Sequence, residues 1–174
     1  AARLNLAGTI DLTVVRQAID LLQSQPGELA INLSSETMAN WEFRNKLTEL
    51  LHQHSGLCNR LWFEVPEYGV FREYEAFRDL CHTLKQLGCK VGIEHFGQRF
   101  NEIQNLSDLG LDYLKVDSSL VRDIAQDPGN QQILKGLCRM AHGIGVLVIA
   151  VGVQNSSEQS ALIELGFDGL TGPF

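Results

Sequence analysis

The sequence predicts an α/β fold built on a mainly parallel β-sheet, and two observations support that prediction. Six short apolar runs alternate with stretches that carry apolar residues at helical spacing, as in a sheet covered by helices. Polar residues fall at the carboxyl ends of the predicted strands, where a closed (β/α) barrel builds a site from several strands at once. An open doubly wound sheet would concentrate them at one switch point, so the pattern favours the barrel.

The first half of the chain supplies three of the predicted strands and the helices between them. Apolar residues at helical spacing predict a helix over 11–25, which Pro26 and Gly27 end. Asn40 is a capping residue for a helix that continues to residue 54. The other elements predicted here are strands over 28–34, 60–66 and 90–96 and a helix over 68–87 that Gly88 closes.

The second half repeats the alternation of helices and strands. Gly110 closes a short helix over 102–109, and Pro128 starts a helix that runs to residue 143. Asn155 and Glu158 have the spacing of a capping box, which opens a helix to residue 165. The remaining predictions are a helix over 118–126 and strands over 112–117, 146–151 and 168–171.

Composition excludes several classes of protein. A chain of 174 residues is long enough for one domain, which we expect to span 1–174. The net charge of -7 argues against binding of DNA or RNA, which needs clustered basic residues. No apolar run approaches the roughly 20 residues that cross a bilayer. The four cysteines lack Cys-x-x-Cys spacing, so we expect buried, reduced thiols in a cytosolic setting.

Asn32, Glu64 and Glu94 stand at the carboxyl ends of three successive predicted strands. Oxygen donors of this kind suit magnesium, manganese or calcium. Each of them alone would be explained as a helix cap, an ion-pair partner or a solvated strand end. Together they predict a converging polar site.

Lys115, His95 and Asp117 add charged and titratable groups at neighbouring strand ends. Lys115 could neutralise a phosphate or act as a base, and an ion pair with Asp117 is the structural alternative. His95 follows Glu94 directly, and adjacent residues of a strand point to opposite faces. One of these two side chains would therefore face a barrel mouth and the other would point sideways.

Six short segments of the chain match, in order, the motifs of a known family. They are Asn32-Leu33-Ser34, Glu64-Val65-Pro66-Glu67, Glu94-His95-Phe96-Gly97, Lys115-Val116-Asp117, Ala150-Val151-Gly152-Val153-Gln154 and Thr171-Gly172-Pro173. The chain resembles an EAL domain, a TIM-like (β/α) barrel that binds and, when intact, hydrolyses the bacterial second messenger cyclic di-GMP. The resemblance places the Glu-Ala-Leu motif before residue 1, so the N-terminal strand region of the barrel is expected to be missing.

Several positions depart from the pattern of active EAL domains. In those relatives paired aspartates bind two metals that activate water, and the second aspartate is His95 here. Val151 and Gln154 replace glutamates, and Arg99 replaces a glycine in the loop after the paired acids. The losses remove negative charge from a pocket for a dianionic ligand, which favours binding without a required metal. Glu64 remains, with Glu94, so one Mg²⁺ site is conceivable.

The Glu-His-Phe-Gly motif and the closing segment 166–173 are most similar to those of LapD-type receptors. This resemblance implies a catalytically inactive cyclic di-GMP receptor, the cytoplasmic domain of a bacterial inner-membrane protein. It further implies that homodimerisation regulates biofilm adhesion. The implied partners are other domains of the same receptor and, through the full-length receptor, a periplasmic protease.

We expect no catalytic residues, and the ligand-binding residues implied by the resemblance are Asn32, Glu64, Glu94, His95, Lys115, Asp117, Thr171, Gly172 and Pro173. The segment 171–173 would let the last strand approach the nucleotide closely, although a plain turn explains its Gly-Pro pair equally well. Two other functions stay open. The chain could be a residual metal-dependent phosphodiesterase, or a protein-interaction domain that no longer binds nucleotide.

Overall fold

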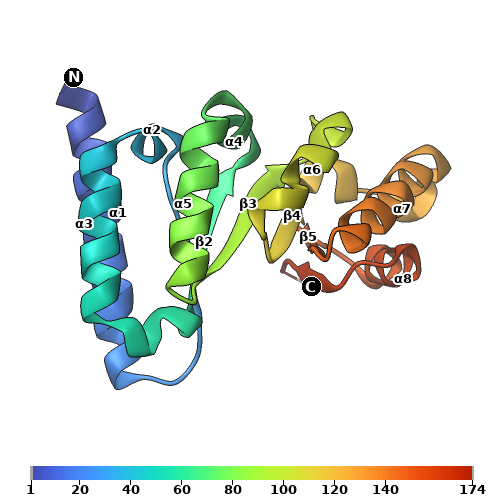
Figure 1. Cartoon of the computed structure of the whole chain (residues 1–174). Helices are drawn as coiled ribbons and strands as arrows, with labels where there is room; N and C mark the ends of the chain where they lie inside the picture. The colour runs from blue at the N-terminus through green and yellow to red at the C-terminus, as the bar shows by residue number, and fades with distance from the viewer. Residues whose placement is uncertain (1, 174) are drawn as a thin grey trace. The chain divides into compact units, whose positions relative to one another are not determined.

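The structure is a computed structural model that describes residues 2–173, with side chains from residue 6 onward. The chain divides into two compact units, of which the first ends at Gly92 and the second begins at Ile93 (Figure 1). The single domain expected over 1–174 therefore stays a prediction. In the part of the chain that is described, no helix is both long and apolar enough to cross a membrane.

The first unit contains two parallel strands and the helices that flank them. Its elements are α1 (Ala2–Ser24), β1 (Leu29–Asn32), α2 (Ser35–Met38), α3 (Trp41–Gln53), the 3₁₀ helix η1 (Ser55–Arg60), β2 (Leu61–Pro66), α4 (Glu67–Arg72) and α5 (Tyr74–Gln86). The two strands pair in register from Leu29 opposite Leu61 to Asn32 opposite Glu64. The long helices α1 and α3 run side by side (Figure 1).

The second unit repeats this arrangement with three parallel strands. The boundary between the units falls inside β3 (Lys90–Phe96). The elements that follow are η2 (Phe100–Leu109), β4 (Tyr113–Val116), α6 (Ser118–Val121), η3 (Ile124–Gln126), α7 (Pro128–Gly143), β5 (Leu147–Val151), α8 (Ser156–Leu165) and β6 (Gly169–Thr171). The strand order follows the chain, from β1 to β6. Parallel strands alternating with helices confirm the predicted α/β class.

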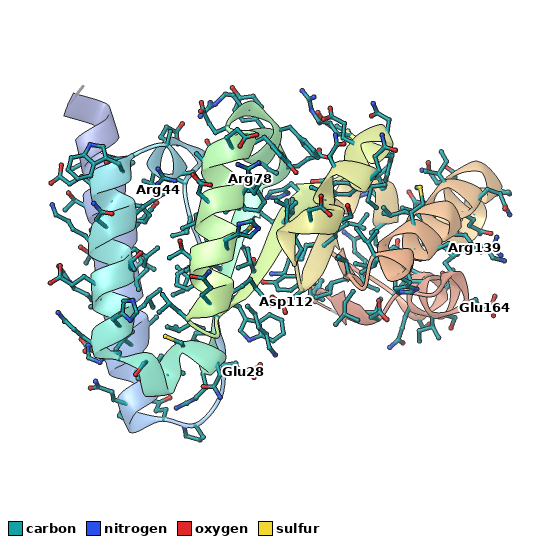
Figure 2. All side chains as sticks on the ribbon, viewed as in Figure 1. Glu28, Arg44, Arg78, Asp112, Arg139 and Glu164 are labelled. Atoms are coloured by element: carbon teal, nitrogen blue, oxygen red, sulfur yellow. The ribbon has the colours of Figure 1, made fainter. Side chains whose placement is uncertain are left out.

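Helix α5 shows how the sequence pattern produces the core of the first unit. Its buried residues are Phe77, Leu80, Cys81 and Leu84, which recur at the three- and four-residue spacing of one helix face. The outer face is charged, and Asp79 forms an ion pair with Arg44 of α3 at 3.6 Å; Figure 2 labels Arg44. All four cysteines of the chain are buried, as predicted, and none forms a disulfide in the described part.

Three predicted helices differ from the structure. Helix α1 begins at Ala2, nine residues before the predicted start at residue 11. The helix predicted over 68–87 is divided into α4 and α5 at Glu73, whose φ of -123° and ψ of 45° are not helical. The helix predicted over 118–126 is divided into α6 and η3, and Asp123 between them has a left-handed φ of 57°.

Helix α4, which ends just before Glu73, packs closely on α2. A Cβ atom on Gly69 of α4 would overlap the side chain of Ser35 of α2, so the two short helices touch backbone to side chain. Neither glycine nor proline occurs at the break itself, so the local sequence carried no signal for it.

Candidate functional site

In the first unit, Asn32 and Glu64 lie side by side at the ends of β1 and β2. They are register partners, and the Leu33 N–H donates to the Glu64 carbonyl at 2.8 Å, which continues the pairing past the end of β1. Glu64 is only 2% exposed, whereas Asn32 is exposed. Register partners of parallel strands project to the same face. The structure therefore brings these two predicted residues together, and their ligand role stays a prediction.

A buried carboxylate that sequence reasoning missed holds the segment after β1. Asp11 of α1 accepts hydrogen bonds from the Ser34 N–H at 3.0 Å, the Ser34 hydroxyl at 2.7 Å and the Thr37 hydroxyl at 2.9 Å. Asp11 lies next to Leu12 on the buried face of its helix. An acid on an apolar helix face was the one available signal, because buried acids need hydrogen-bond partners.

In the second unit, His95 departs from the regular strand that was predicted. Its φ of 54° lies in the left-handed region, which costs a residue other than glycine roughly 1–2 kcal/mol. The imidazole Nδ1 lies 3.0 Å from Oδ2 of Asp117. Backbone strain of this kind persists only where surrounding contacts compensate for it, and this hydrogen bond is such a contact.

Asp117 connects the ends of β3 and β4 to the start of α6. Its N–H donates to the Phe96 carbonyl at 3.0 Å, and its Oδ1 accepts from the Ser119 N–H at 2.9 Å as the helix cap. Hydrogen bonds from Ser119 lower the pKa of Asp117, and His95 shifts that pKa in the same direction. The carboxylate is therefore ionised near neutral pH, and Nδ1 of His95 is the donor in their hydrogen bond.

Glu94 and Lys115 complete the polar groups at these strand ends. The Glu94 carboxylate is 16% exposed and lies 4.0 Å from Nε2 of His95, so His95 stands between two carboxylates. Lys115 is half-buried on β4, opposite Ile149 of β5. The contacts thus bring Glu94, His95 and Asp117 together, with Lys115 on the adjoining strand.

The closing segment is fixed by backbone contacts within the second unit. The Thr171 carbonyl accepts from the N–H groups of Gly152 at 2.7 Å and Val153 at 3.0 Å. A Cβ atom on Gly172 would overlap the carbonyl oxygen of Val153 and lie 2.6 Å from its nitrogen. Glycine at 172 is thus required by packing against Val153, a reason that the sequence did not reveal. Pro173 follows as an exposed residue.

The donor set of the second unit does not fit a two-metal centre. Such a centre needs closely spaced carboxylates that bridge two cations. Here the imidazole of His95 contacts Asp117 and approaches Glu94. Across residues 2–173, no group of three or more His, Cys, Asp or Glu side chains is placed to hold a metal ion.

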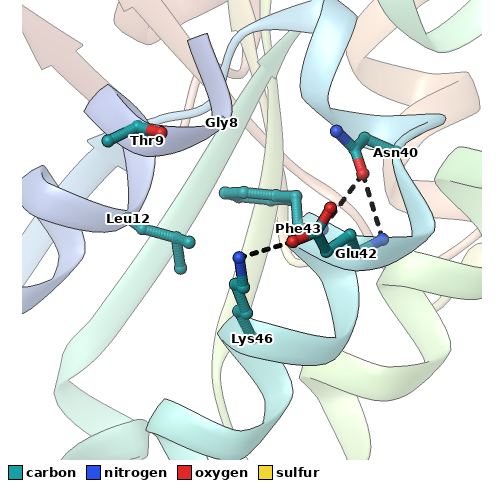
Figure 3. Close-up of a pocket in the computed structure, with 7 residues that line it drawn as sticks. All are labelled: Gly8, Thr9, Leu12, Asn40, Glu42, Phe43 and Lys46. Atoms are coloured by element: carbon teal, nitrogen blue, oxygen red, sulfur yellow. Dashed lines mark hydrogen bonds and ion pairs between the residues drawn. The ribbon is translucent and has the colours of Figure 1, made fainter. Parts of the chain in front are cut away.

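A small pocket in the first unit contains none of the predicted site residues (Figure 3). Its volume is about 180 Å³, and its lining residues are Gly8, Thr9, Leu12, Asn40, Glu42, Phe43 and Lys46. The Asn40 carboxamide accepts from the N–H groups of Glu42 and Phe43, and the Lys46 ammonium pairs with the Glu42 carboxylate at 2.6 Å. Asn40 caps α3, and the pair of Lys46 with Glu42 stabilises the same helix. The polar groups of this pocket therefore have a structural role in α3.

Comparison with known proteins places the whole chain in one family. The family model described as "EAL domain" matches residues 1–174. The chain is 27% identical over 177 residues to the cyclic di-GMP phosphodiesterase PdeF of Escherichia coli. That match covers 99% of this chain and 24% of PdeF, so the chain spans about a quarter of that relative's length.

Solved structures show the same fold. The FimX EAL domain of Pseudomonas aeruginosa, bound to cyclic di-GMP, matches 99% of this chain and 71% of its own at 28% identity and a TM-score of 0.89. BlrP1 of Klebsiella pneumoniae was solved in a complex with manganese and cyclic di-GMP. The match covers 90% of this chain and 40% of BlrP1, at 27% identity and a TM-score of 0.75. The match with LapD of Vibrio cholerae covers 98% of this chain and 42% of the LapD chain, at 23% identity and a TM-score of 0.90. At this identity the likeness shows the fold alone. These likenesses confirm the predicted TIM-like type of fold.

Proposed function

Because the chain belongs to the EAL domain family, we propose that it is a catalytically inactive receptor domain that binds cyclic di-GMP. The observation that carries this proposal is the hydrogen bond from His95 to Asp117, at 3.0 Å. In a two-metal phosphodiesterase the metals supply the attacking water and stabilise the charge that develops on the phosphate. An imidazole does not bridge two hard cations as a carboxylate does, so His95 favours binding over hydrolysis.

Two further positions support the same proposal. Val151 at the end of β5 offers no ligand atom, although active relatives have a glutamate there. Gln154 is neutral, and its backbone N–H is already bonded to the Glu158 carboxylate at 2.8 Å. Carboxylates that face a phosphate without an intervening cation repel it. Their replacement therefore lowers the electrostatic cost of binding a dianionic nucleotide without metal.

The remaining polar groups suit recognition of a phosphodiester. Lys115 is half-buried, and a partly desolvated ammonium interacts strongly with a phosphate oxygen. Asn32 and Glu64 are proposed to contact the ligand or a cation, and Thr171 is proposed to contact the ligand. The FimX domain, which is 28% identical, was solved with cyclic di-GMP bound, which supports the choice of this ligand.

The proposal extends to the larger protein through the motifs shared with LapD-type receptors. We propose that the chain is the cytoplasmic domain of an inner-membrane receptor that dimerises on binding nucleotide. The periplasmic part would then sequester a protease that controls biofilm adhesins. Sedimentation of the full chain with and without cyclic di-GMP tests the first step, and an unchanged monomer in both conditions would contradict it.

A residual phosphodiesterase is the second candidate, and one observation favours it. Asn32 and Glu64 are register partners, and Glu94 is retained, so oxygen donors for a single cation persist in the sequence. PdeF, which is 27% identical, is a phosphodiesterase.

Product analysis separates the two candidates. The chain would be incubated with cyclic di-GMP and Mn²⁺ or Mg²⁺, and the nucleotide separated by chromatography. We expect intact cyclic dinucleotide over a period in which the phosphodiesterase PdeF, as positive control, cleaves it. Repeated turnover by this chain would contradict the receptor proposal.

Replacing Lys115 with methionine is expected to lower the affinity for cyclic di-GMP by about 10- to 100-fold, since a charge-assisted hydrogen bond to phosphate is lost. The matched control is Lys135→Met, which removes a lysine from an exposed position of α7. Calorimetric titration measures both variants. Equal affinities for the two would show that Lys115 does not contact the ligand.

A further inference from the structure

Glu158 joins two separate segments of the second unit through its buried carboxylate. Oε1 accepts from the Asp123 N–H at 3.0 Å, and Oε2 accepts from the Gln154 N–H at 2.8 Å. The residue is 2% exposed. In a capping box the acid bonds the N–H of the capping residue, which here is Asn155. The Glu158 carboxylate instead accepts from the N–H groups of Gln154 and Asp123, and so it connects two loops.

Both segments held by Glu158 have unusual backbone conformations. Asp123 has a left-handed φ of 57°, and the charge-assisted bond to its N–H helps to hold that turn. Gly152, at the start of the other segment, has a φ of 83°. A Cβ atom on Gly152 would lie 2.9 Å from Cβ of Ser118, the residue that follows Asp117. The segment Gly152–Gln154 therefore packs directly against the start of α6.

The opposite side of the same segment holds the end of β6. Gly152 and Val153 donate their N–H groups to the Thr171 carbonyl, and Gly172 packs on the Val153 backbone without room for a side chain. The segment Gly152–Gln154 thus lies between Ser118 and Thr171. It links two groups of residues proposed to contact the nucleotide, one at Asp117 and one at Thr171.

We propose that Glu158 is a positioning residue for cyclic di-GMP binding. Its carboxylate fixes the segment Gly152–Gln154, which in turn sets the position of Thr171 relative to Asp117. Glu158 does not touch the ligand, because its carboxylate is buried and bonded to two backbone N–H groups. This inference rests on the proposed function, since it concerns the same ligand site.

The test compares Glu158→Gln with wild-type chain by calorimetric titration of cyclic di-GMP, well below the unfolding temperature. Glutamine keeps the shape and one carbonyl acceptor, but its amide nitrogen cannot accept the second N–H. We expect an affinity about ten-fold lower, because small displacements of ligand-contacting groups reduce binding at that scale. Glu158→Ala removes both acceptors and is expected to lower the affinity further.

Asp127→Ala is the matched control. Asp127 caps α7 in the same unit, accepting from the Asn130 N–H at 3.0 Å, and it contacts neither Gly152–Gln154 nor Thr171 in the hydrogen bonds described. It should lower the unfolding temperature, because a helix cap is lost, and leave the affinity unchanged. Amide hydrogen exchange adds a local measurement, since exchange at Gly152 and Val153 should accelerate in Glu158→Gln and not in Asp127→Ala.

The outcomes separate this inference from the function on which it rests. Wild-type binding with an unchanged Glu158→Gln affinity overturns the positioning role and leaves the receptor proposal standing. An equal loss of affinity in Asp127→Ala also overturns it, because the effect then follows overall stability. A wild-type chain that does not bind overturns both.

Discussion

Replacing Gly172 with alanine is expected to lower the free energy of unfolding by about 3 kcal/mol, because overpacking against backbone atoms cannot be relieved by a side-chain rotation. The new Cβ atom would overlap the Val153 carbonyl oxygen. Relief requires β6 to move, which breaks the two hydrogen bonds that the Thr171 carbonyl accepts. Urea unfolding measures the stability, and the affinity for cyclic di-GMP should fall in the same variant.

Gly136→Ala is a control that is expected to change the free energy of unfolding in the opposite direction. Gly136 lies within α7, and apart from the adjoining backbone of that helix no atom lies within 4 Å of the position that its Cβ would occupy. Alanine is favoured over glycine in a helix interior by about 1 kcal/mol, so this variant should be more stable than the wild type. A Gly172→Ala variant with the stability of the wild type would contradict the close packing of Gly172 on Val153.

Replacing Asp11 with alanine is expected to lower the free energy of unfolding by about 3 kcal/mol, because buried donors lose an ionised acceptor. The Ser34 N–H, the Ser34 hydroxyl and the Thr37 hydroxyl all donate to Oδ2 of Asp11. The same bonds connect α1 to the segment that follows Asn32. We therefore expect the affinity for cyclic di-GMP to decrease together with stability.

Asp20→Ala is the control for Asp11, since it makes the same substitution on the same helix at an exposed position. Surface substitutions of this kind change stability by about 0.5 kcal/mol or less. Thermal or urea unfolding of the two variants gives the comparison. A loss of stability in Asp11→Ala no larger than that in Asp20→Ala would contradict the role of Asp11.

The strands were predictable because their signal is local. The strand predicted over 90–96 is confirmed as β3, and the capping residues Asn40 and Asn155 accept the backbone N–H bonds expected of them. The break at Glu73 was not predictable, because neither glycine nor proline occurs there.

The candidate site was predictable only in part. Strand-end residues such as Lys115 and Asp117 could be placed by their position after an apolar run. Their supporting groups could not, because Asp11 and Glu158 act on backbone N–H groups 23 and 35 residues away. The left-handed conformation of His95 and its hydrogen bond to Asp117, 22 residues away, were also not predictable from the local sequence.

The most direct test of the receptor proposal is calorimetric titration of cyclic di-GMP into the protein, first with magnesium and then with a chelator. The recovered nucleotide would be analysed for cleavage. We predict the same affinity in both conditions and intact nucleotide, since the ligand is held by groups such as Lys115. Binding that disappears on chelation, cleavage of the nucleotide, or no binding in either condition would contradict it.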